Sequence, residues 1–250
     1  MKIVIIGSGN VAYHLARAFQ ENNIPVSQLF GRNGNDLKFI SDQLQIPFST
    51  TRLADAELYL ICVSDGSISE VSKLITKENC LVSHTSGSLP KEILEGKYRK
   101  SNFYPLQTFS KFKDLNYKDI PFFVEADDEQ DLELLQNLAL TISDKVMVST
   151  YEKRKYLHLT AVFACNFVNH LFARAKEISD SQEIPFDYFL PLIKETTEKI
   201  EILEPKLAQT GPAVRNDERV LQLHEALISN EEHLKIYKIM NESIKKMYEL

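Results

Sequence analysis

The sequence predicts an α/β protein in which a doubly wound parallel sheet is followed by an all-α C-terminal domain. Two observations carry this prediction. Up to residue 150, short apolar runs alternate with stretches of helical spacing, and strands apolar on both faces are typical of a parallel sheet covered by helices. Residues 151–250 contain no strand-like run and a single glycine, Gly211. We therefore expect two domains, residues 1–150 and 151–250.

The expected elements follow one another in a regular order. Strands are expected at residues 3–6, 26–30, 58–63, 80–83, 102–104, 121–125 and 145–149. Helices are expected from residue 10 to about 20 and at 37–44, 68–75, 89–94, 129–142, 151–179, 185–203 and 218–250. The last helix is expected to break near Asn230, because this residue interrupts its helical pattern.

Composition excludes several classes of function. The chain has 250 residues, of which 44% are hydrophobic, so it can bury a core without metals or disulfides. Its net charge of −6 argues against a nucleic-acid partner. No run approaches the roughly 18 apolar residues of a membrane span, and the apolar run after Lys2 is too short for a signal peptide. We therefore expect a soluble, cytoplasmic protein with no membrane partner.

The three cysteines, Cys62, Cys80 and Cys165, lie far apart and form no Cys-x-x-Cys motif. Two of them lie inside apolar runs. We therefore expect buried, reduced thiols without redox or metal function. Zinc spacing and a Walker loop are also lacking, so no metal site is predicted.

The turn after the first strand matches the dinucleotide fingerprint, with alanine in the third glycine position. It reads Gly7-Ser8-Gly9-Asn10-Val11-Ala12. The first glycine allows a tight turn, the second lets the backbone approach a pyrophosphate, and the alanine lets the helix pack closely. The N–H groups that open the helix can then bind the anion. A purely structural turn is the alternative, but the flanking strand and amphipathic helix favour a Rossmann-type cofactor site.

The second strand ends in Phe30-Gly31-Arg32-Asn33, where an NAD site normally offers an acidic residue to the ribose hydroxyls. The first acid here is Asp36. Arg32 places a planar cation there, which suits a 2′-phosphate. NADP is therefore favoured over NAD as the cofactor, with Arg32 and Asn33 as ligands, although a solvated loop arginine is the alternative.

Polar residues also follow the third and fourth strands, whose carboxyl ends form the ligand crevice in such sheets. Val63, Ser64 and Asp65 are expected to contact the cofactor, although Ser64 and Asp65 can instead cap the next helix. The polar group after the fourth strand can hold a nicotinamide amide or a substrate carboxylate, or can cap a helix that starts near Pro90. It consists of His84, Thr85 and Ser86, with Ser86 a candidate for both ligands.

The first helix after residue 150 carries polar residues at spacings of three and four, which lie on one stripe of a helix. They are Lys155, His158, Asn166 and Asn169, with Val162 between them. Apolar neighbours suggest that much of this helix is buried, so the stripe can face the crevice. His158 is then a candidate proton donor, with Lys155 as its alternative and Asn166 as an orienting amide. A solvated helix face is the competing interpretation.

A third polar segment, residues 210–217, lies between two helices. Asp217 is available to cap the following helix, and Arg215 can reach an anionic substrate. A structural turn between helices explains the same residues equally well.

Together these motifs resemble the Rossmann-like bacterial proteins that carry a helical C-terminal domain of unknown function. The resemblance rests on GSGNVA, FGRN, HTSGSL, YPLQTF, KYLHLTAVFACNF and TGPAVRND, and it spans nearly the whole chain. That family is similar in plan to pyrroline-5-carboxylate reductase, ketopantoate reductase and deazaflavin-dependent NADP reductases. The resemblance implies an NADP-linked reductase that forms a homodimer through its helical domain, with Tyr104 and Gln107 near the substrate. The family usually has histidine where this chain has Tyr104, so a catalytic role there is in doubt and His158 gains weight.

We therefore expect an NADP-dependent oxidoreductase that reduces a carbonyl or imine of a small metabolite in a cleft between its domains. A non-catalytic NADP-binding or redox-sensing dimer is the main alternative, and a ligand-free structural protein is a third. Fold analogy alone does not separate them.

Overall fold

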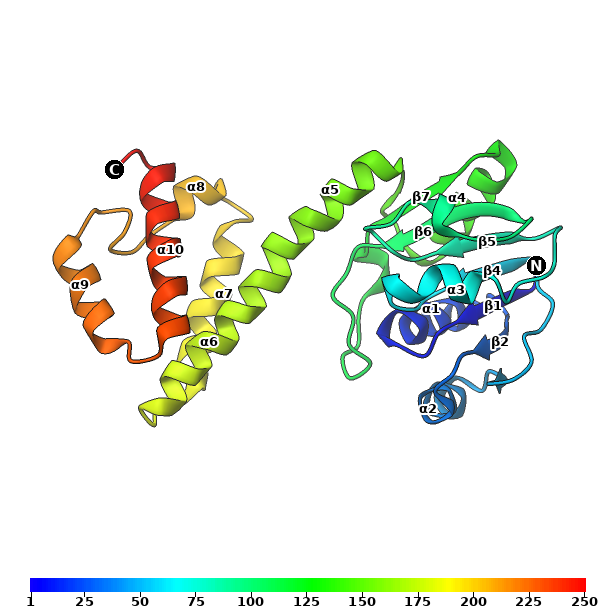
Figure 1. Cartoon of the computed structure of the whole chain (residues 1–250), viewed down its shortest axis with the longest axis horizontal. Coiled ribbons are helices and arrows are strands. Elements are labelled where there is room, and N and C mark those ends of the chain that lie inside the picture. Colours follow the sequence, from blue (N-terminus) through cyan, green and yellow to red (C-terminus); the bar gives the residue numbers. More distant parts are fainter. The chain divides into compact units, whose positions relative to one another are not determined.

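The computed structural model describes all 250 residues and divides into two compact units, Met1–Asn166 and Phe167–Leu250 (Figure 1). After the last strand, β8 (Val146–Val148), the chain contains only helices, the first of which begins at Tyr151. This change in secondary structure lies close to the domain boundary expected near residue 150. The compact units divide farther along, because the first turns of the next helix pack with the sheet through the buried side chain of Arg154.

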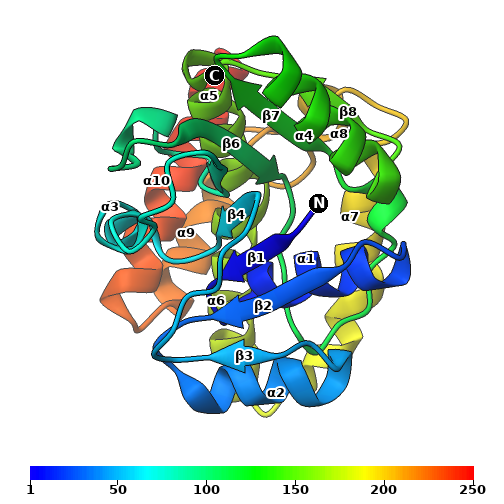
Figure 2. The same ribbon diagram turned by 90° about the vertical axis from the view of Figure 1, so that its right-hand side faces the viewer.

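The N-terminal unit is built on one eight-stranded sheet with the order β3-β2-β1-β4-β5-β6-β7-β8 (Figure 2). All neighbours are parallel except β6 and β7, which are antiparallel. The strands are β1 (Ile3–Ile6), β2 (Val26–Phe30), β3 (Phe48–Ser49), β4 (Leu58–Ile61), β5 (Leu81–His84), β6 (Arg99–Pro105), β7 (Phe122–Ala126) and β8 (Val146–Val148).

Helices cover both faces of this sheet, and apolar side chains of alternate strand positions meet them in two separate cores. One face packs against α1 (Asn10–Glu21), α2 (Gly34–Leu44) and α4 (Glu129–Ile142), and the other packs against α3 (Ile68–Ser72). In β1, for example, Ile3 and Ile5 enter the first core, whereas Val4 and Ile6 enter the second. The predicted doubly wound α/β fold is therefore confirmed.

Three local predictions were wrong or incomplete. Strand β7 runs antiparallel to β6, since residues 106–121 return as a loop and an antiparallel pair needs no crossover helix. The expected helix at 89–94 is a single 3₁₀ turn, Lys91–Ile93, because Pro90 and the turn before it leave few residues for a helix. The short strand β3 lies outside the predicted set.

Parallel pairing aligns the carboxyl ends of the central strands. Ile6 pairs with both Phe30 and Ile61, Ile61 pairs with His84, and His84 pairs with Asn102. The residues that follow these strands therefore emerge at one edge of the sheet. This register brings together the glycine turn (residues 7–12), the turn that contains Arg32 (residues 30–33) and the HTSG loop (residues 84–87), although they are far apart in the sequence.

The long helix expected after residue 150 is confirmed as three continuous segments. They are α5 (Tyr151–Ala161), a π-helical turn (Val162–Phe167) and α6 (Val168–Ser181). The π turn was not predicted, because it leaves no clear mark on apolar spacing. Residues 163–167 are exposed, so the expectation that this helix is largely buried was wrong for the single chain. Cys165 is exposed for the same reason, whereas Cys62 and Cys80 are buried as expected.

The helical unit continues with α7 (Leu190–Lys199), α8 (Pro205–Ala208), α9 (Glu218–Leu227) and α10 (Glu231–Met247). Asp217 caps α9 as predicted, and Asn230 caps α10, which confirms the expected break. The unit buries few side chains and leaves large apolar ones exposed, including Ile202 at 86% and Leu227 at 81%. None of its helices, nor any in the N-terminal unit, is long and apolar enough to cross a membrane.

Candidate cofactor and active site

The two glycines of the first turn serve different physical purposes. Gly7 has a φ of +139°, and a Cβ there would lie 2.2 Å from the backbone oxygen of Cys62. Only glycine fits such a turn without strain. A Cβ on Gly9 would meet no atom within 4 Å, so the space above that residue is open. Gly7 therefore shapes the turn, and Gly9 leaves room for a ligand to approach the backbone.

The N-terminus of α1 is left without a partner from the protein. Gly9 at the N-cap has no side chain that could accept from the first N–H groups, and the first turn contains no acidic residue. Ala12 is fully buried, so the helix packs closely behind the turn. Free N–H groups and the positive end of the helix dipole together favour an anion at this position.

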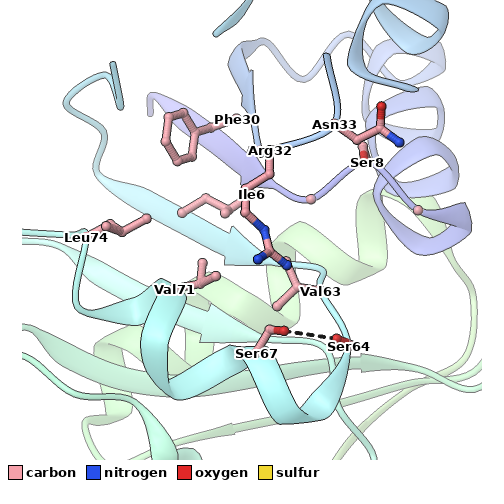
Figure 3. Close-up of a pocket in the computed structure, with 13 residues that line it drawn as sticks. Ile6, Ser8, Phe30, Arg32, Asn33, Val63, Ser64, Ser67, Val71 and Leu74 are labelled. Carbon is pink, nitrogen blue, oxygen red and sulfur yellow. Dashed lines mark hydrogen bonds between the residues drawn. The ribbon is translucent and has the colours of Figure 1, made fainter. Parts of the chain in front are cut away.

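A cavity of about 370 Å³ opens beside this turn, at the carboxyl ends of β1, β2 and β4 (Figure 3). Its volume falls within the range of small-molecule sites. Apolar side chains form much of its wall, and no acidic residue lines it. The lining consists of Ile6, Gly7, Ser8, Gly9, Phe30, Gly31, Arg32, Asn33, Val63, Ser64, Ser67, Val71 and Leu74.

Arg32 reaches across this cavity from the end of β2 toward Val63 and Ser67 (Figure 3). No ion pair binds its guanidinium within the chain. Asn33 accepts a hydrogen bond from the backbone N–H of Asp36 and donates one to its carboxylate, so it caps α2. The hydroxyl groups of Ser64 and Ser67 form a hydrogen bond of 3.1 Å on the opposite wall of the cavity. The cavity thus combines apolar walls with one free cation.

The HTSG loop after β5 is held by polar groups beneath it. His84 is fully buried, and its Nδ1 accepts from the backbone N–H of Ser86 at 3.2 Å. Burial lowers the pKa of His84 to about 4, which keeps the ring neutral. The amide of Asn102 donates to the carbonyl oxygens of His84 and Ser86, both at 2.9 Å. His84 therefore supports the loop from inside.

Two other predicted ligands in this loop also make internal bonds. The Ser86 hydroxyl oxygen accepts from the backbone N–H groups of Ser88 and Leu89, and the Thr85 hydroxyl donates to the carbonyl of Ile61 at 3.3 Å. Ser86 therefore acts as a cap, as in the alternative interpretation, but it caps a turn that is followed only by the 3₁₀ turn Lys91–Ile93. Its hydroxyl proton is still available to a ligand, because the oxygen acts only as acceptor in these two bonds.

Tyr104, Gly87 and His158 meet at the same edge of the sheet. Tyr104 is 7% exposed, and its Oη lies 3.2 Å from Nδ1 of His158. A Cβ on Gly87 would lie 2.6 Å from the Tyr104 ring and 2.9 Å from Cβ of His158. Glycine at position 87 thus lets the loop press against both side chains. The structure brings these residues together from β6, the HTSG loop and α5.

A buried ion pair beneath this cluster was missed by the sequence analysis. Arg154 is completely buried, pairs with Glu125 of β7, and donates to the carbonyl oxygen of Leu89 at 2.7 Å. Lys91 lies 4.0 Å from the same glutamate. The sequence offered no clear signal, because Arg154 stands in a basic run that is typical of a solvated helix.

Four other predicted residues do not line the cavity. Asn10 ties the glycine turn to a later loop, since its amide donates to the carbonyl of Phe109 and accepts from Lys111 N–H. Gln107 accepts from the backbone of its neighbour Thr108. Lys155 pairs with Glu152 on its own helix, and Arg215 is exposed within the helical unit.

The π turn changes which residues share a face of the long helix. In an α-helix, residues eight apart are offset by most of a quarter turn, so Asn166 would not lie directly above His158. A turn with i→i+5 bonds takes in about one more residue, and such turns are frequent at functional sites. The added residue brings Asn166 closer to the face of His158 than an unbroken α-helix would, and a joint role of the two residues stays a prediction.

The sheet order, the glycine turn and the helices after β8 define a Rossmann-like protein with a helical C-terminal unit. The chain belongs to the family that carries the domain of unknown function DUF2520, whose sequence profile matches residues 120–244. This confirms the resemblance seen in its motifs. The sequence matches no curated protein.

Solved structures agree with this assignment. A Bacteroides fragilis protein provisionally assigned as an NADP oxidoreductase is 37% identical, with a TM-score of 0.94 over 98% of each chain. A Thermotoga maritima protein is 22% identical, with a TM-score of 0.73 over 99% of this chain and 98% of that one. Pyrroline-5-carboxylate reductase from Streptococcus pyogenes is 13% identical, with a TM-score of 0.61 over 100% and 99%. The last two likenesses concern the fold.

Proposed function

We propose that the protein is an NADP-dependent oxidoreductase that reduces a carbonyl or imine of a small metabolite. The observation that carries this proposal is the pairing of an open glycine turn with an acid-free cavity that contains the free cation of Arg32. The similar Bacteroides protein, provisionally assigned as an NADP oxidoreductase, supports the choice of cofactor.

The residues present fit such a cofactor. The N–H groups at the start of α1 would hold the pyrophosphate, and the apolar walls of the cavity would hold the adenine ring. Arg32 would bind the 2′-phosphate through its planar fork, where an acidic residue would repel it. NADPH would supply a hydride, which is chemistry that no side chain of this chain provides.

The side chains of the protein would contribute a proton to the substrate and would hold the substrate in the reactive orientation. His158 would give a proton to the substrate heteroatom, since its Nε2 makes no hydrogen bond within the chain. Asn166, on the same helical face, would orient the substrate because an amide can donate and accept without changing its charge. Lys155 is a weaker candidate, because Glu152 already engages its ammonium group.

We also propose that the protein is a homodimer that shares its helical units. The exposed apolar residues of this unit would then be covered by a second copy, as cyclic dimers are the commonest closed assemblies.

Titration calorimetry with NADPH and NADH tests the proposed cofactor. We expect NADPH to bind at least about tenfold more tightly, a difference of about 1.4 kcal/mol. Arg32→Ala should remove most of this preference. Arg52→Ala is the matched control, because that arginine does not line the cavity. Equal affinities of the wild-type protein for both cofactors would contradict the assignment.

A further inference from the structure

Tyr104 and His158 form a pair whose hydrogen-bond direction can be worked out from their surroundings. The phenol is buried, and its one hydrogen bond within the chain joins it to Nδ1 of His158 at 3.2 Å. The rings meet edge to face, with centroids 6.2 Å apart. Gly87 packs against both residues, so the geometry is supported from a third side.

The phenol of Tyr104 keeps its proton at neutral pH. Burial raises its pKa to about 12, with a smaller contribution from the negative charge of Asp65, while Arg154 acts in the opposite direction. A buried O–H group needs an acceptor, and Nδ1 of His158 is the acceptor in reach. A neutral imidazole that accepts at Nδ1 carries its proton on Nε2.

This arrangement is the reverse of a carboxylate–histidine pair. A carboxylate accepts from Nδ1–H and leaves Nε2 as a base. A tyrosine hydroxyl donates to Nδ1 when the ring is neutral and can rotate to accept from Nδ1–H when the ring is protonated. In both of these resting charge states Nε2 carries a proton, which it can give up only to a substrate.

We propose that Tyr104 is a positioning residue that holds His158 as a hydrogen donor at Nε2, so that the pair serves the reductive direction of the reaction. This inference rests on the proposed function. In the reductive step the N–H bond at Nε2 of the imidazolium breaks, and an O–H or N–H bond forms on the substrate. The neutral ring that remains carries its proton on Nδ1 and donates it in a hydrogen bond to Oη of Tyr104. A hydronium ion from solvent then gives a proton to Nε2 and becomes water, which restores the imidazolium.

The chain contains a matched reference pair. Nδ1 of His14 lies 2.9 Å from the hydroxyl of Tyr117, and its Nε2 lies 2.8 Å from the carbonyl oxygen of Ser110. The carbonyl can only accept, so His14 must also carry its proton on Nε2. The nitrogen-15 signals of His14 therefore serve as a reference, in the same sample, for a neutral histidine that is protonated on Nε2.

The test is nitrogen-15 NMR of the full chain with labelled histidine, without any ligand and at a pH where His158 is neutral. We expect His158 to show a protonated Nε2 and an unprotonated Nδ1, as His14 does. Tyr104→Phe should convert His158 into a mixture of tautomers and leave His14 unchanged. Tyr117→Phe should have no effect on His158.

A protonated Nδ1 in the wild-type protein would overturn the proposal, and so would an unchanged tautomer in Tyr104→Phe. A backbone amide spectrum of each variant shows whether it is folded, and Tyr104→Leu provides a second variant that lacks the hydroxyl. Failure to bind NADPH would contradict the proposed function but would leave the tautomer result as measured, so the two failures are distinguishable.

Discussion

The guanidinium of Arg154 is fully buried against the carboxylate of Glu125, and this pair joins helix α5 to strand β7. The same guanidinium holds the carbonyl oxygen of Leu89 at the end of the HTSG loop. One side chain therefore fixes three segments around Tyr104 and His158. The Arg154–Glu125 pair therefore supports the position of the Tyr104–His158 cluster.

Replacing Arg154 should destabilise the fold strongly. Arg154→Met keeps the bulk but leaves a half-buried carboxylate and a carbonyl oxygen without their donor. We expect a loss of about 3 kcal/mol in the free energy of unfolding, near the lower end for a broken buried pair, because Glu125 retains some access to water. Urea denaturation measures this loss of stability.

The control is Arg17→Met, which removes exposed ion pairs with Glu21 and Asp114 and should lower the free energy of unfolding by less than about 1 kcal/mol. Similar losses for both variants would contradict the role of Arg154.

Substitutions at the two glycines of the fingerprint should have different effects, on stability at Gly7 and on cofactor binding at Gly9. Gly7→Ala forces a Cβ into the backbone of Cys62 at a positive φ, so we expect a loss of about 2 kcal/mol or more in stability. Gly9→Ala meets no atom of the protein, so its melting temperature should stay within a few degrees of the wild type. Its affinity for NADPH should fall at least about tenfold, because the methyl group occupies the approach of the pyrophosphate. Thermal melts and calorimetry on both variants check this, and tight NADPH binding by Gly9→Ala would argue against the site.

His84 should make stability depend on pH. Its pKa is near 4 in the folded protein, because burial disfavours the charged ring, and about 6.5 when unfolded. Below pH 6.5 the unfolded chain therefore binds a proton that the folded chain excludes, and stability falls as the pH is lowered toward 4. Between about pH 7.5 and 5.5 we expect the wild type to lose about 1 kcal/mol more than His84→Gln. Denaturant titrations at both pH values measure this, with exposed His170→Gln as control. Parallel curves for wild type and His84→Gln would show that the folded protein does not exclude this proton, which would contradict a lowered pKa of His84.

Much of this fold follows from local patterns in the sequence. The β-branched run Ile3–Ile6 and the glycines after it specify a strand, a tight turn and a helix without help from distant residues. The Tyr104–His158 contact could not be predicted in this way. It depends on the register of β5 with β6 and on the close approach of Gly87, both of which are tertiary relations. The strand β7 was predicted, but its antiparallel direction was not, because the apolar pattern of a strand is the same for either direction.

The oligomeric state should be a dimer. Large apolar side chains of the helical unit, such as Ile202 and Leu227, are almost fully exposed in one chain. Such a surface is unusual for a monomer and typical of a protein interface. Light scattering should therefore give about twice the chain mass of 28.7 kDa. Leu227→Asp should shift the protein toward the monomer, whereas Leu140→Asp, on α4 of the N-terminal unit, should not. A wild-type monomer at micromolar concentration would contradict the proposed assembly.

The chemical role of His158 gives the last prediction. Its Nε2 makes no hydrogen bond within the chain, while Tyr104 engages Nδ1, so one nitrogen is positioned and the other is available to a substrate. A positioned acid typically contributes 10²–10⁴-fold to rate. With a substrate found by screening small carbonyl and imine compounds for NADPH oxidation, His158→Ala should lower kcat about a hundredfold or more. Its affinity for NADPH should change less than about twofold, because the glycine turn and Arg32, which are the proposed phosphate ligands, are separate from His158. His170→Ala, an exposed histidine on α6, should keep full turnover. If His158→Ala retains more than about a tenth of the wild-type kcat, the proton comes from another group and the stripe shared with Asn166 serves binding alone.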